Sequence, residues 1–341
     1  MWATETRDGG TETSSRATTC PEGFSITSEI TPFRGRVAIT GVTGLAGQQL
    51  APRLKADGAT VIGVSRSAAR ARGKVPALSD AIRWGGADAA FEEGAFHGLD
   101  AVVHLAGEPV SGRWTRDKKR RIERSRVEGT RRVVDAIERA ETPPKVLISA
   151  SAMGIYGDRG ETAVTEEEPY GDDFLARVCK GWEREAQRAE SLGVRVVRMR
   201  IGLVLSPDGG ALGSMLPIFK GGIGGRLGSG TQWWSWIHLE DLVAFIARAL
   251  ADERMEGAYN VVSPDPIRQI DFAKTLGGVL GRPTVLPTPG LVLKTVLGGF
   301  AVEVLGSRRI LPQRMTASGF HFRFTDLDAA LRDLLEAPSP G

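Results

Sequence analysis

The segment from Arg36 to Gly47 joins a short apolar run to three glycines, Gly41, Gly44 and Gly47. We predict a strand, a sharp turn and the beginning of a helix. Gly41 permits the turn, Gly44 lets the backbone approach a diphosphate, and Gly47 lets the helix pack closely. The N–H groups of the first helical turn then face the phosphates. This context favours a dinucleotide-binding site over an ordinary strand–turn–helix unit. The predicted contacts are Gly41, Thr43, Gly44, Leu45, Ala46 and Gly47.

The end of the second predicted strand, residues 60–64, indicates which dinucleotide binds. NAD sites place an acidic residue here to hold the ribose 2′-hydroxyl. This chain has Ser65 and Arg66 instead, and a guanidinium pairs with a 2′-phosphate. We therefore predict NADP(H), with Arg66 as the leading contact and Ser65 beside it. The alternative is a solvated basic loop, which we favour for Arg70 and Arg72.

The composition excludes several classes of protein. The 341 residues can bury a large core, and no apolar run is long enough to span a bilayer. A formal net charge of +3 is too small to indicate nucleic-acid binding. The two cysteines, Cys20 and Cys179, provide no disulfide framework, which fits a reducing compartment.

Residues 1–34 differ from the rest of the chain. They are rich in Thr, Ser, Gly and Glu and have no sustained apolar period, which predicts a disordered or loosely attached extension. The extension has no apolar secretory core, and its acidic residues argue against a transit peptide. We therefore predict a cytoplasmic protein.

Strand and helix patterns alternate after Arg36, which predicts a parallel sheet covered on both faces. The predicted fold class is α/β, a Rossmann-type doubly wound parallel sheet with a smaller α+β C-terminal lobe. Predicted strands are one directly before Gly41, then 60–64, 81–84, 101–107, 145–149, 194–199, 259–262 and 320–324. Predicted helices include 115–139, 173–190, 239–250 and 327–335. Residues 35–205 with about 239–263 form the predicted NADP-binding domain, and 206–238 with 264–336 the substrate lobe.

Several further motifs resemble the extended short-chain dehydrogenase/reductase superfamily. They are the glycine spacing and the segments 102–107, 155–157 and 236–242. A narrower resemblance is to the "epimerase family" group, sugar-nucleotide epimerase-like proteins with a distinct C-terminal domain. Its matching segments are 113–114, 125–130, 149–152, 156–157, 173–176, 182–183, 200–205, 221–236, 311–315 and 319–320. The resemblance covers roughly residues 36–336 and implies a Rossmann-type sheet and NADP binding, without a secure substrate.

In the superfamily that this chain resembles, a Tyr and a Lys four residues later transfer the proton. Here Lys180 is the only lysine of the corresponding helix, and Ala176 stands four residues before it. Placing the helix by residues 182–183 instead puts Leu175 and Cys179 at the two positions. Neither register provides the Tyr, so the usual acid/base pair is missing.

Ser151, Tyr156 and Lys180 are the remaining candidates for chemistry. Ser151 lies just past the carboxyl end of the fifth predicted strand, where open α/β sheets bind ligands. Tyr156 is a candidate proton donor, and the alternative is a loop aromatic that covers the cofactor. Lys180 is a candidate contact of the nicotinamide ribose, and the alternative is a solvated lysine.

The turn after the fourth predicted strand also belongs to the predicted cofactor site. The resemblance implies backbone contact from Leu105, Ala106 and Gly107, since Gly107 permits close approach. Glu108 is a candidate for ribose or substrate, and a surface carboxylate is equally plausible. His104 on the buried strand fits a hydrogen-bonded core histidine better than a base.

Arg200, Arg226 and Trp234 are the candidate substrate contacts outside this turn. The two arginines are possible anion anchors, with a structural ion pair as the alternative. The glycine-rich segment 221–230 permits a lid, and Trp234 beside it suits a ring-shaped ligand or a bridge between the lobes.

The basic run 113–126 has no aromatic interleaving, so we interpret it as a solvated helix face or a lining for an anionic substrate. Within it, Arg126 stands where the superfamily commonly has a structural Asn. The superfamily often dimerises through this helix and the helix after the fifth strand, which favours a homodimer.

These features predict an NADP(H)-binding protein with a small-molecule substrate and no metal, nucleic-acid or membrane partner. The favoured function is an oxidoreductase or epimerase-type enzyme acting on a carbonyl or hydroxyl compound. The alternative is a non-catalytic NADP(H)-binding protein that regulates or supports an assembly.

Overall fold

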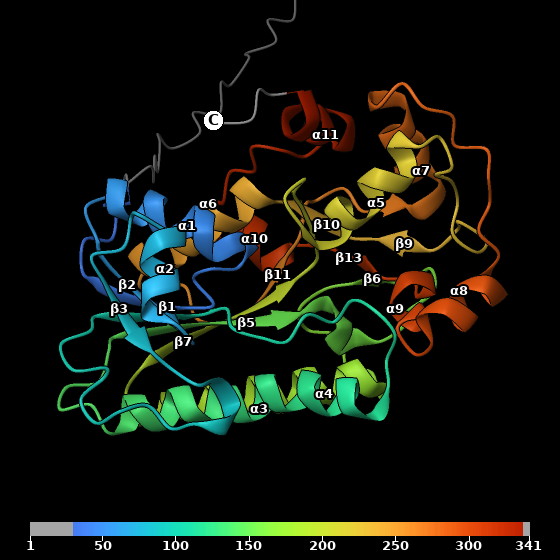
Figure 1. The fold of residues 1–341 in the computed structure, drawn as a ribbon. Coiled ribbons are helices and arrows are strands. Elements are labelled where there is room, and N and C mark those ends of the chain that lie inside the picture. Colours follow the sequence, from blue (N-terminus) through green and yellow to red (C-terminus); the bar gives the residue numbers. More distant parts are fainter. Residues whose placement is uncertain (1–29, 337–341) are drawn as a thin grey trace, which may run out of the picture. The chain divides into compact units, whose positions relative to one another are not determined.

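Seven parallel strands form the central sheet of the computed structural model, which describes residues 30–336 (Figure 1). The strands are β1 Arg36–Thr40, β2 Thr60–Ser65, β3 Asp80–Arg83, β4 Ala101–His104, β5 Val146–Ala152, β7 Arg195–Ile201 and β11 Gly257–Val261. Their order is β11-β7-β5-β4-β1-β2-β3. This order confirms the predicted doubly wound Rossmann-type sheet. The predicted extension, apart from its last five residues, lies outside the described residues.

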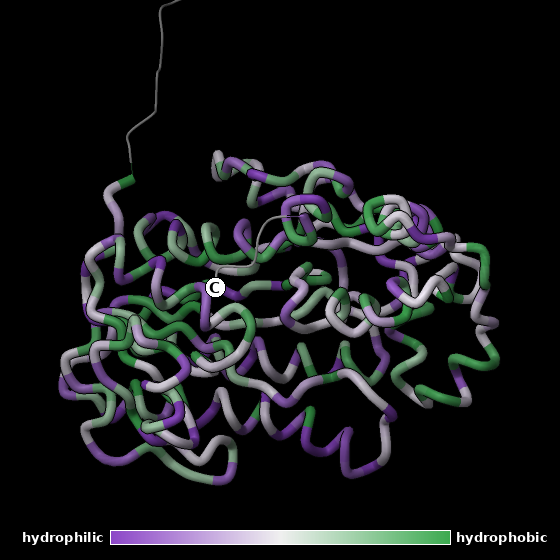
Figure 2. Tube along the Cα trace, turned by 45° about the horizontal axis from the view of Figure 1, so that its top comes forward, coloured by the Kyte–Doolittle hydropathy of each residue, from purple (hydrophilic) through white to green (hydrophobic). Residues whose placement is uncertain are grey.

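The central strands β1 and β4 are buried on both faces because helices cover both faces of the sheet, whereas β3 is partly exposed. In β1, Val37 and Ile39 belong to the core cluster that includes α1 (Leu45–Ala56) and α6 (Leu239–Ala251). Ala38 belongs to the cluster on the side of α3 (Arg116–Glu138). In Figure 2 the central strands are largely apolar, while the covering helices mix apolar and hydrophilic residues. Continuous apolar runs are the expected signature of such a doubly covered parallel sheet.

Helices cover the sheet and build the C-terminal part. They are α1 Leu45–Ala56, α2 Ala68–Lys74, α3 Arg116–Glu138, α4 Phe174–Gln187, α5 Gly210–Lys220, α6 Leu239–Ala251, α7 Gln269–Val279, α8 Gly290–Leu297, α9 Ala301–Leu305, α10 Gln313–Ala317 and α11 Leu327–Glu336. Three short 3-10 helices span Gly86–Asp88, Met153–Tyr156 (η2) and Arg188–Leu192. Helices α3 and α4 lie on one face of the sheet, and α1 and α6 on the other (Figure 1).

Three small strand pairs accompany the C-terminal helices. They are β8 Leu203–Leu205 with β10 Trp236–His238, β9 Trp233–Trp234 with β12 Ile267–Arg268, and β6 Ala163–Val164 with β13 Arg309–Ile310. Trp236, Phe272 and Leu331 share a separate apolar core in this part. Because β8 follows β7 directly, these elements lie beyond the carboxyl ends of β5 and β7.

The predicted strand 320–324 is wrong. This segment has no strand, and its backbone N–H groups bind a side chain instead of a neighbouring strand. The N–H groups of Arg323 and Phe324 donate to the Asp241 carboxylate at 2.8 and 3.0 Å. The alternating aromatic residues therefore belong to an extended segment that is hydrogen-bonded to α6. Periodicity alone cannot distinguish such a segment from a strand of a sheet.

Within residues 30–336, no helix combines the length and the apolar character that crossing a bilayer requires. The same residues contain no group of three or more side chains suited to hold a metal ion.

Replacing Gly47 by Ala should destabilise the protein by about 1–3 kcal/mol, because a small-to-large change forces a packed backbone apart. A Cβ on Gly47 would lie 2.6 Å from both the Gly41 oxygen and the Val42 Cα. Urea unfolding measures the change. Gly73→Ala is the control, since a Cβ there meets nothing within 4 Å and Ala favours the helix. Equal stability of the two variants would contradict the close packing.

Candidate functional site

The turn between β1 and α1 lies where the strand order reverses, because β1 pairs with β2 on one side and β4 on the other. Open α/β sheets bind ligands at such a point, beyond the carboxyl ends of the strands. Gly41 has a φ of 68°, and a Cβ on it would lie 2.9 Å from the Ala106 nitrogen. The Gly44 N–H donates to the Gly41 oxygen at 2.8 Å. The turn therefore leaves no room for a side chain at Gly41.

Helix α1 begins with backbone donors that its own side chains do not satisfy. Its N-cap residue is Gly44, and in the described part of the chain no side chain caps it. By contrast, the side chains of Thr115 and Asp173 cap α3 and α4. The first-turn N–H groups of α1, including those of Leu45 and Ala46, have no intrahelical acceptor. They point out of a helix N-terminus whose first turn has no acidic residue, which suits an anion.

The loop after β2 and helix α2 bring cations near this turn. Ser65 is half-buried and Arg66 is exposed. The Lys74 ammonium donates to the Thr43 oxygen of the glycine turn at 3.2 Å. No sequence signal pointed to Lys74, because this contact joins distant parts of the chain. Arg72 lies on α2 and forms an exposed ion pair with Asp80 at 2.5 Å.

The turn after β4 is held by hydrogen bonds to β1. The Thr40 hydroxyl accepts from the N–H groups of Leu105 at 3.1 Å and Ala106 at 3.2 Å. Its oxygen also lies 2.7 Å from Nδ1 of His104, whose Nε2 lies 3.1 Å from the Thr130 hydroxyl. Burial lowers the pKa of His104 to about 4, so the ring stays neutral at ordinary pH. His104 is thus a core histidine that fixes this turn.

Glu108 connects the turn after β4 to α3 through two ion pairs. Its carboxylate accepts from the Lys118 ammonium at 2.8 Å and from Arg121 Nε at 3.3 Å. The hydrogen bond from Lys118 holds the pKa of Glu108 below its usual value. The Glu108 N–H donates to the Ser125 hydroxyl at 2.9 Å. The carboxylate that we considered for ribose or substrate is therefore already engaged with two cations.

Arg126 occupies the space between this turn and α4. Its guanidinium lies 3.4 Å from the point that a Cβ on Gly107 would occupy, and 5.1 Å from the ring centroid of Trp182. Its Nη1 donates to the carbonyl oxygens of Glu108 and Ile122 at 3.0 and 3.3 Å. Burial lowers the pKa of Arg126, and none of the ion pairs among residues 30–336 neutralises it. A half-buried cation whose hydrogen-bond acceptors are carbonyl oxygens is suited to an anionic ligand.

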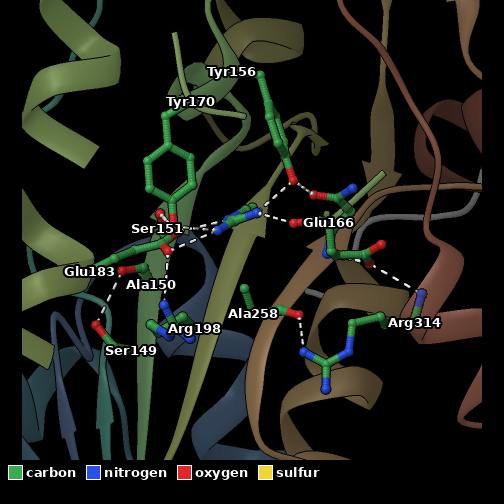
Figure 3. A network of polar contacts seen from close by, with 12 residues as sticks. Ser149, Ala150, Ser151, Tyr156, Glu166, Tyr170, Glu183, Arg198, Ala258 and Arg314 are labelled. Atoms are coloured by element: carbon green, nitrogen blue, oxygen red, sulfur yellow. Dashed lines mark hydrogen bonds and ion pairs between the residues drawn. The ribbon is translucent and has the colours of Figure 1, made fainter. Parts of the chain in front are cut away.

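A buried ionic network joins β5, β7 and α4 (Figure 3). The Glu183 side chain is 3% exposed and accepts from the Ser151 hydroxyl at 2.8 Å. It also accepts from Arg200 at 2.9 and 3.1 Å and from Arg198 at 3.2 Å. Arg200, which is itself 2% exposed, is therefore held in a structural ion pair. The Ser151 hydroxyl is also engaged inside the protein.

Tyr156 belongs to the same network (Figure 3). It is fully buried, donates to Asn260 Oδ1 at 2.7 Å and accepts from Arg200 Nη1 at 2.8 Å. Burial raises the pKa of Tyr156 to about 12, which disfavours proton transfer at neutral pH. The geometry therefore corrects two expectations: Tyr156 is not presented as a proton donor, and Arg200 is not free to anchor an anion.

The inward positions of α4 carry no acid/base pair. Leu175 and Cys179 are buried, whereas Lys180 is exposed on the outer side of the helix. The helix therefore adopts the register in which Leu175 and Cys179 replace the superfamily's Tyr and Lys. Burial raises the pKa of the Cys179 thiol to about 12. Lys180 matches the alternative of a solvated lysine.

Trp234 and Arg226 do not meet at one site. Trp234 is 8% exposed, packs against Phe272 at a centroid distance of 5.3 Å and donates to the Val304 oxygen at 3.3 Å. Arg226 is exposed, and its Nη1 donates to the Ser229 oxygen at 3.4 Å. Trp234 therefore supports the C-terminal core, and a contact with substrate has no geometric support.

The glycine-rich segment 221–230 is packed against a neighbouring strand-like segment. A Cβ on Gly225 would lie 2.0 Å from the Leu286 oxygen. The Gly228 N–H donates to the Thr288 oxygen at 2.9 Å. Gly225 and Gly228 thus allow the two backbone segments to approach each other closely. The movement of this segment as a lid stays a prediction.

Glu303 did not stand out in the sequence, although it is a lone acidic residue in the apolar run 300–305. It lies on α9, where one oxygen accepts from Arg308 Nη2 at 3.1 Å. Its other oxygen, Oε2, lies 3.8 Å from the point that a Cβ on Gly154 would occupy. The side chain is 14% exposed. An acidic residue within an apolar run is the signal that predicts a buried carboxyl.

Known proteins resemble this chain in both sequence and fold. Residues 37–262 match the NAD dependent epimerase/dehydratase family, and residues 288–334 match a domain of unknown function (DUF1731). The chloroplastic homolog of epimerase family protein SDR39U1 from Arabidopsis thaliana is 41% identical, over 88% of this chain and 86% of its own length. Epimerase family protein YfhF of Bacillus subtilis is 38% identical, over 88% of this chain and 97% of its own. The crystal structure of human epimerase family protein SDR39U1 (isoform 2) with NADPH has a TM-score of 0.80 at 33% identity, covering 89% of this chain and 100% of that one.

Replacing Glu183 by Gln should lower the free energy of unfolding by about 3–5 kcal/mol, because the buried Arg200 and the half-buried Arg198 lose their counter-ion. Glu240→Gln is the control, since its ion pair with Arg323 is more than half exposed on both sides and should contribute about 0–1 kcal/mol. Chemical unfolding of both variants gives the comparison. A loss near zero for Glu183→Gln would contradict the structural role of the network.

Proposed function

The chain belongs to the NAD dependent epimerase/dehydratase family, and from this premise we propose that it is an NADP(H)-dependent oxidoreductase acting on a carbonyl or hydroxyl compound. Epimerisation of such a compound is the second reaction that this proposal includes. When bound, the nicotinamide supplies or accepts a hydride. The chain's own residues hold the cofactor, orient the substrate and move the proton.

The start of α1 is the observation that carries this proposal. Uncapped N–H groups at a glycine turn, beside the reversal of strand order, suit the diphosphate of a dinucleotide. The tight approach of Gly41 to Ala106 brings the turns after β1 and β4 together. The N–H groups at the start of α1 would hold the diphosphate of a dinucleotide that binds along this edge.

Two cations support the choice of NADP(H) over NAD(H). Arg66 follows β2, where a carboxylate would otherwise hold the ribose 2′-hydroxyl, and Lys74 reaches the Thr43 oxygen of the glycine turn. A guanidinium pairs well with the 2′-phosphate. The human relative was crystallised with NADPH, which agrees with this choice.

Arg126 supports an anionic substrate. Its guanidinium lies beside Gly107 and has carbonyl oxygens as hydrogen-bond acceptors. A half-buried cation that forms no ion pair is costly, and a substrate carboxylate or phosphate would neutralise it through two parallel hydrogen bonds. We therefore infer a carbonyl compound that carries a negative group.

A non-catalytic NADP(H)-binding protein is the second candidate. The engagement of Ser151 and Tyr156 within the protein favours it, because the superfamily's proton transfer has no equivalent on α4. A protein that binds NADP(H) but turns over no carbonyl compound would be this non-catalytic form and not an enzyme. A cytoplasmic location and a homodimer through α3 and α4 remain predictions; the plant relative is named as chloroplastic.

Arg66→Ala should weaken NADPH binding about 10- to 100-fold and leave NADH binding unchanged, because a charge-assisted hydrogen bond to the 2′-phosphate contributes roughly 1.5–3 kcal/mol. Calorimetric titration with both cofactors measures the effect. Arg72→Ala is the matched control, since Arg72 is paired with Asp80. An unchanged preference in Arg66→Ala would show that another group reads the phosphate.

Aldehydes that carry a carboxylate should oxidise NADPH faster than their methyl esters, because Arg126 pairs with the carboxylate. Arg126→Gln should abolish this preference, with a loss of about 10- to 100-fold in kcat/KM for the acids alone. Arg120→Gln removes the same charge from the same helix at a position that is 75% exposed, and should change nothing. Equal rates for acids and esters in the unmodified protein would exclude the anionic substrate.

A further inference from the structure

The group that protonates the substrate oxygen is missing from α4. Leu175 has no proton to give, and the buried Cys179 thiol is a very weak acid, since its pKa is raised to about 12. Tyr156 is engaged with Asn260 and Arg200. A reaction at the carboxyl ends of β4 and β5 therefore needs an acid from another element.

Glu303 of α9 lies near Gly154 of η2, as does Leu175, the residue that replaces the superfamily's Tyr on α4. The Cβ of Leu175 lies 3.3 Å from the position of a Cβ on Gly154, and Glu303 Oε2 lies 3.8 Å from the same position. Gly154 belongs to η2, which follows β5 directly. The Glu303 carboxyl group and Leu175 therefore both lie beside Gly154, just past the carboxyl end of β5, where an open α/β sheet binds its ligand.

The two oxygens of Glu303 have different surroundings. Oε1 accepts from Arg308, which is 2% exposed and donates through Nε to the Gly157 oxygen at 2.9 Å. Arg308 therefore fixes the carboxyl group in position. Oε2 has no hydrogen-bond partner within residues 30–336 and is directed toward Gly154, so it is the oxygen that can carry the reacting proton.

The environment favours the protonated form of Glu303. Burial raises its pKa above the usual value, and the Asp173 carboxylate at the start of α4 raises it further, while Arg308 lowers it. The remaining titratable group that faces it is the Cys179 thiol, which is uncharged. An acid whose pKa is raised toward neutrality is suited to general acid catalysis.

We propose that Glu303 is the proton donor of the site, supplied by the C-terminal domain in place of the missing Tyr. This inference rests on the proposed NADP(H)-dependent chemistry. In the reducing direction, hydride from NADPH forms a C–H bond at the carbonyl carbon as the C=O π bond breaks. The oxygen takes the proton of Glu303, which gives an alcohol, NADP⁺ and the Glu303 carboxylate. Solvent then returns a proton to the carboxylate.

The assignment explains why a domain of unknown function is fused to a nucleotide-binding sheet. Residues 288–334 contain both Glu303 and Arg308. The same domain contacts the segment that precedes α3 through Phe300, whose ring lies 5.8 Å from that of Trp114. The C-terminal domain thereby brings the acid to the sheet and covers the sheet's edge.

The first test needs no substrate and uses the full chain labelled with ¹³C at the glutamate carboxyl carbons. The NMR signal absent from Glu303→Gln identifies Glu303. In unmodified protein this signal should titrate above the ordinary Glu range, and saturating NADP⁺ should lower its midpoint relative to NADPH, because oxidised nicotinamide is a cation. A midpoint within the ordinary range, or one identical with both cofactors, would overturn the proposal.

Calorimetry on the same samples separates this inference from the proposed function. If NADPH does not bind the unmodified protein, both fail. If NADPH binds but the Glu303 signal does not distinguish NADP⁺ from NADPH, the proton-donor assignment fails and the cofactor site stands.

The second test measures catalysis with carbonyl compounds that oxidise NADPH. Glu303→Gln should lower kcat by about 10²–10⁴-fold with unchanged NADPH affinity, and Glu303→Asp should retain part of the rate. In the unmodified protein, reduction should fall as the pH rises through the pKa of Glu303, and this limb should vanish in Glu303→Gln. Glu161→Gln is the control, since it removes an exposed carboxylate paired with Arg268. A Glu303→Gln variant that keeps both its rate and the pH limb would contradict the proposal.

Discussion

The close approach of two backbone turns is the constraint on which the rest of this structure depends. The β1–α1 turn passes so near the turn after β4 that Gly41 has no space for a side chain. Thr40 reinforces the approach by accepting from the N–H groups of Leu105 and Ala106. Helix α1 begins at this point without a side-chain cap, so its free donors face outward. The arrangement creates a fixed positive end at the reversal of the strand order.

A second fixed element lies beside it, at the carboxyl ends of β5 and β7. Glu183 binds Ser151 and two arginines there, and Arg200 in turn holds the Tyr156 hydroxyl. Residue types that often perform chemistry thus stabilise the edge of the sheet in this chain. Because Ser151, Arg200 and Tyr156 are buried and hydrogen-bonded within this network, we assign the reactive part of the site to other elements, namely α3 with Arg126 and α9 with Glu303.

The sequence alone predicted much of the fold, because its signals are local. The glycines at 41, 44 and 47 and the apolar runs of the central strands specify strand, turn and helix within a few residues. The prediction of a strand at 320–324 failed because alternating aromatic residues fit a strand and an isolated extended segment equally well. Here the Asp241 carboxylate accepts from the N–H groups of the segment. The three small strand pairs also escaped prediction, since each strand is only two or three residues long.

The site was less predictable because its contacts join distant segments. Their residue types made Tyr156 and Arg200 candidate site residues. In the structure both are buried and hydrogen-bonded to each other, so they stabilise the fold. Lys74 and Glu303 act through contacts with Thr43 and Gly154 that no spacing in the chain reveals. The register of α4 was foreseen as one of two choices, and packing selected the one that buries Leu175 and Cys179.

A crystal structure of this protein with NADPH tests the central claim most directly. The account predicts diphosphate oxygens within about 3 Å of the first-turn N–H groups of α1, with the 2′-phosphate at Arg66 and the nicotinamide ring toward Gly154. Cofactor bound elsewhere, or bound with its diphosphate away from the glycine turn, would contradict it.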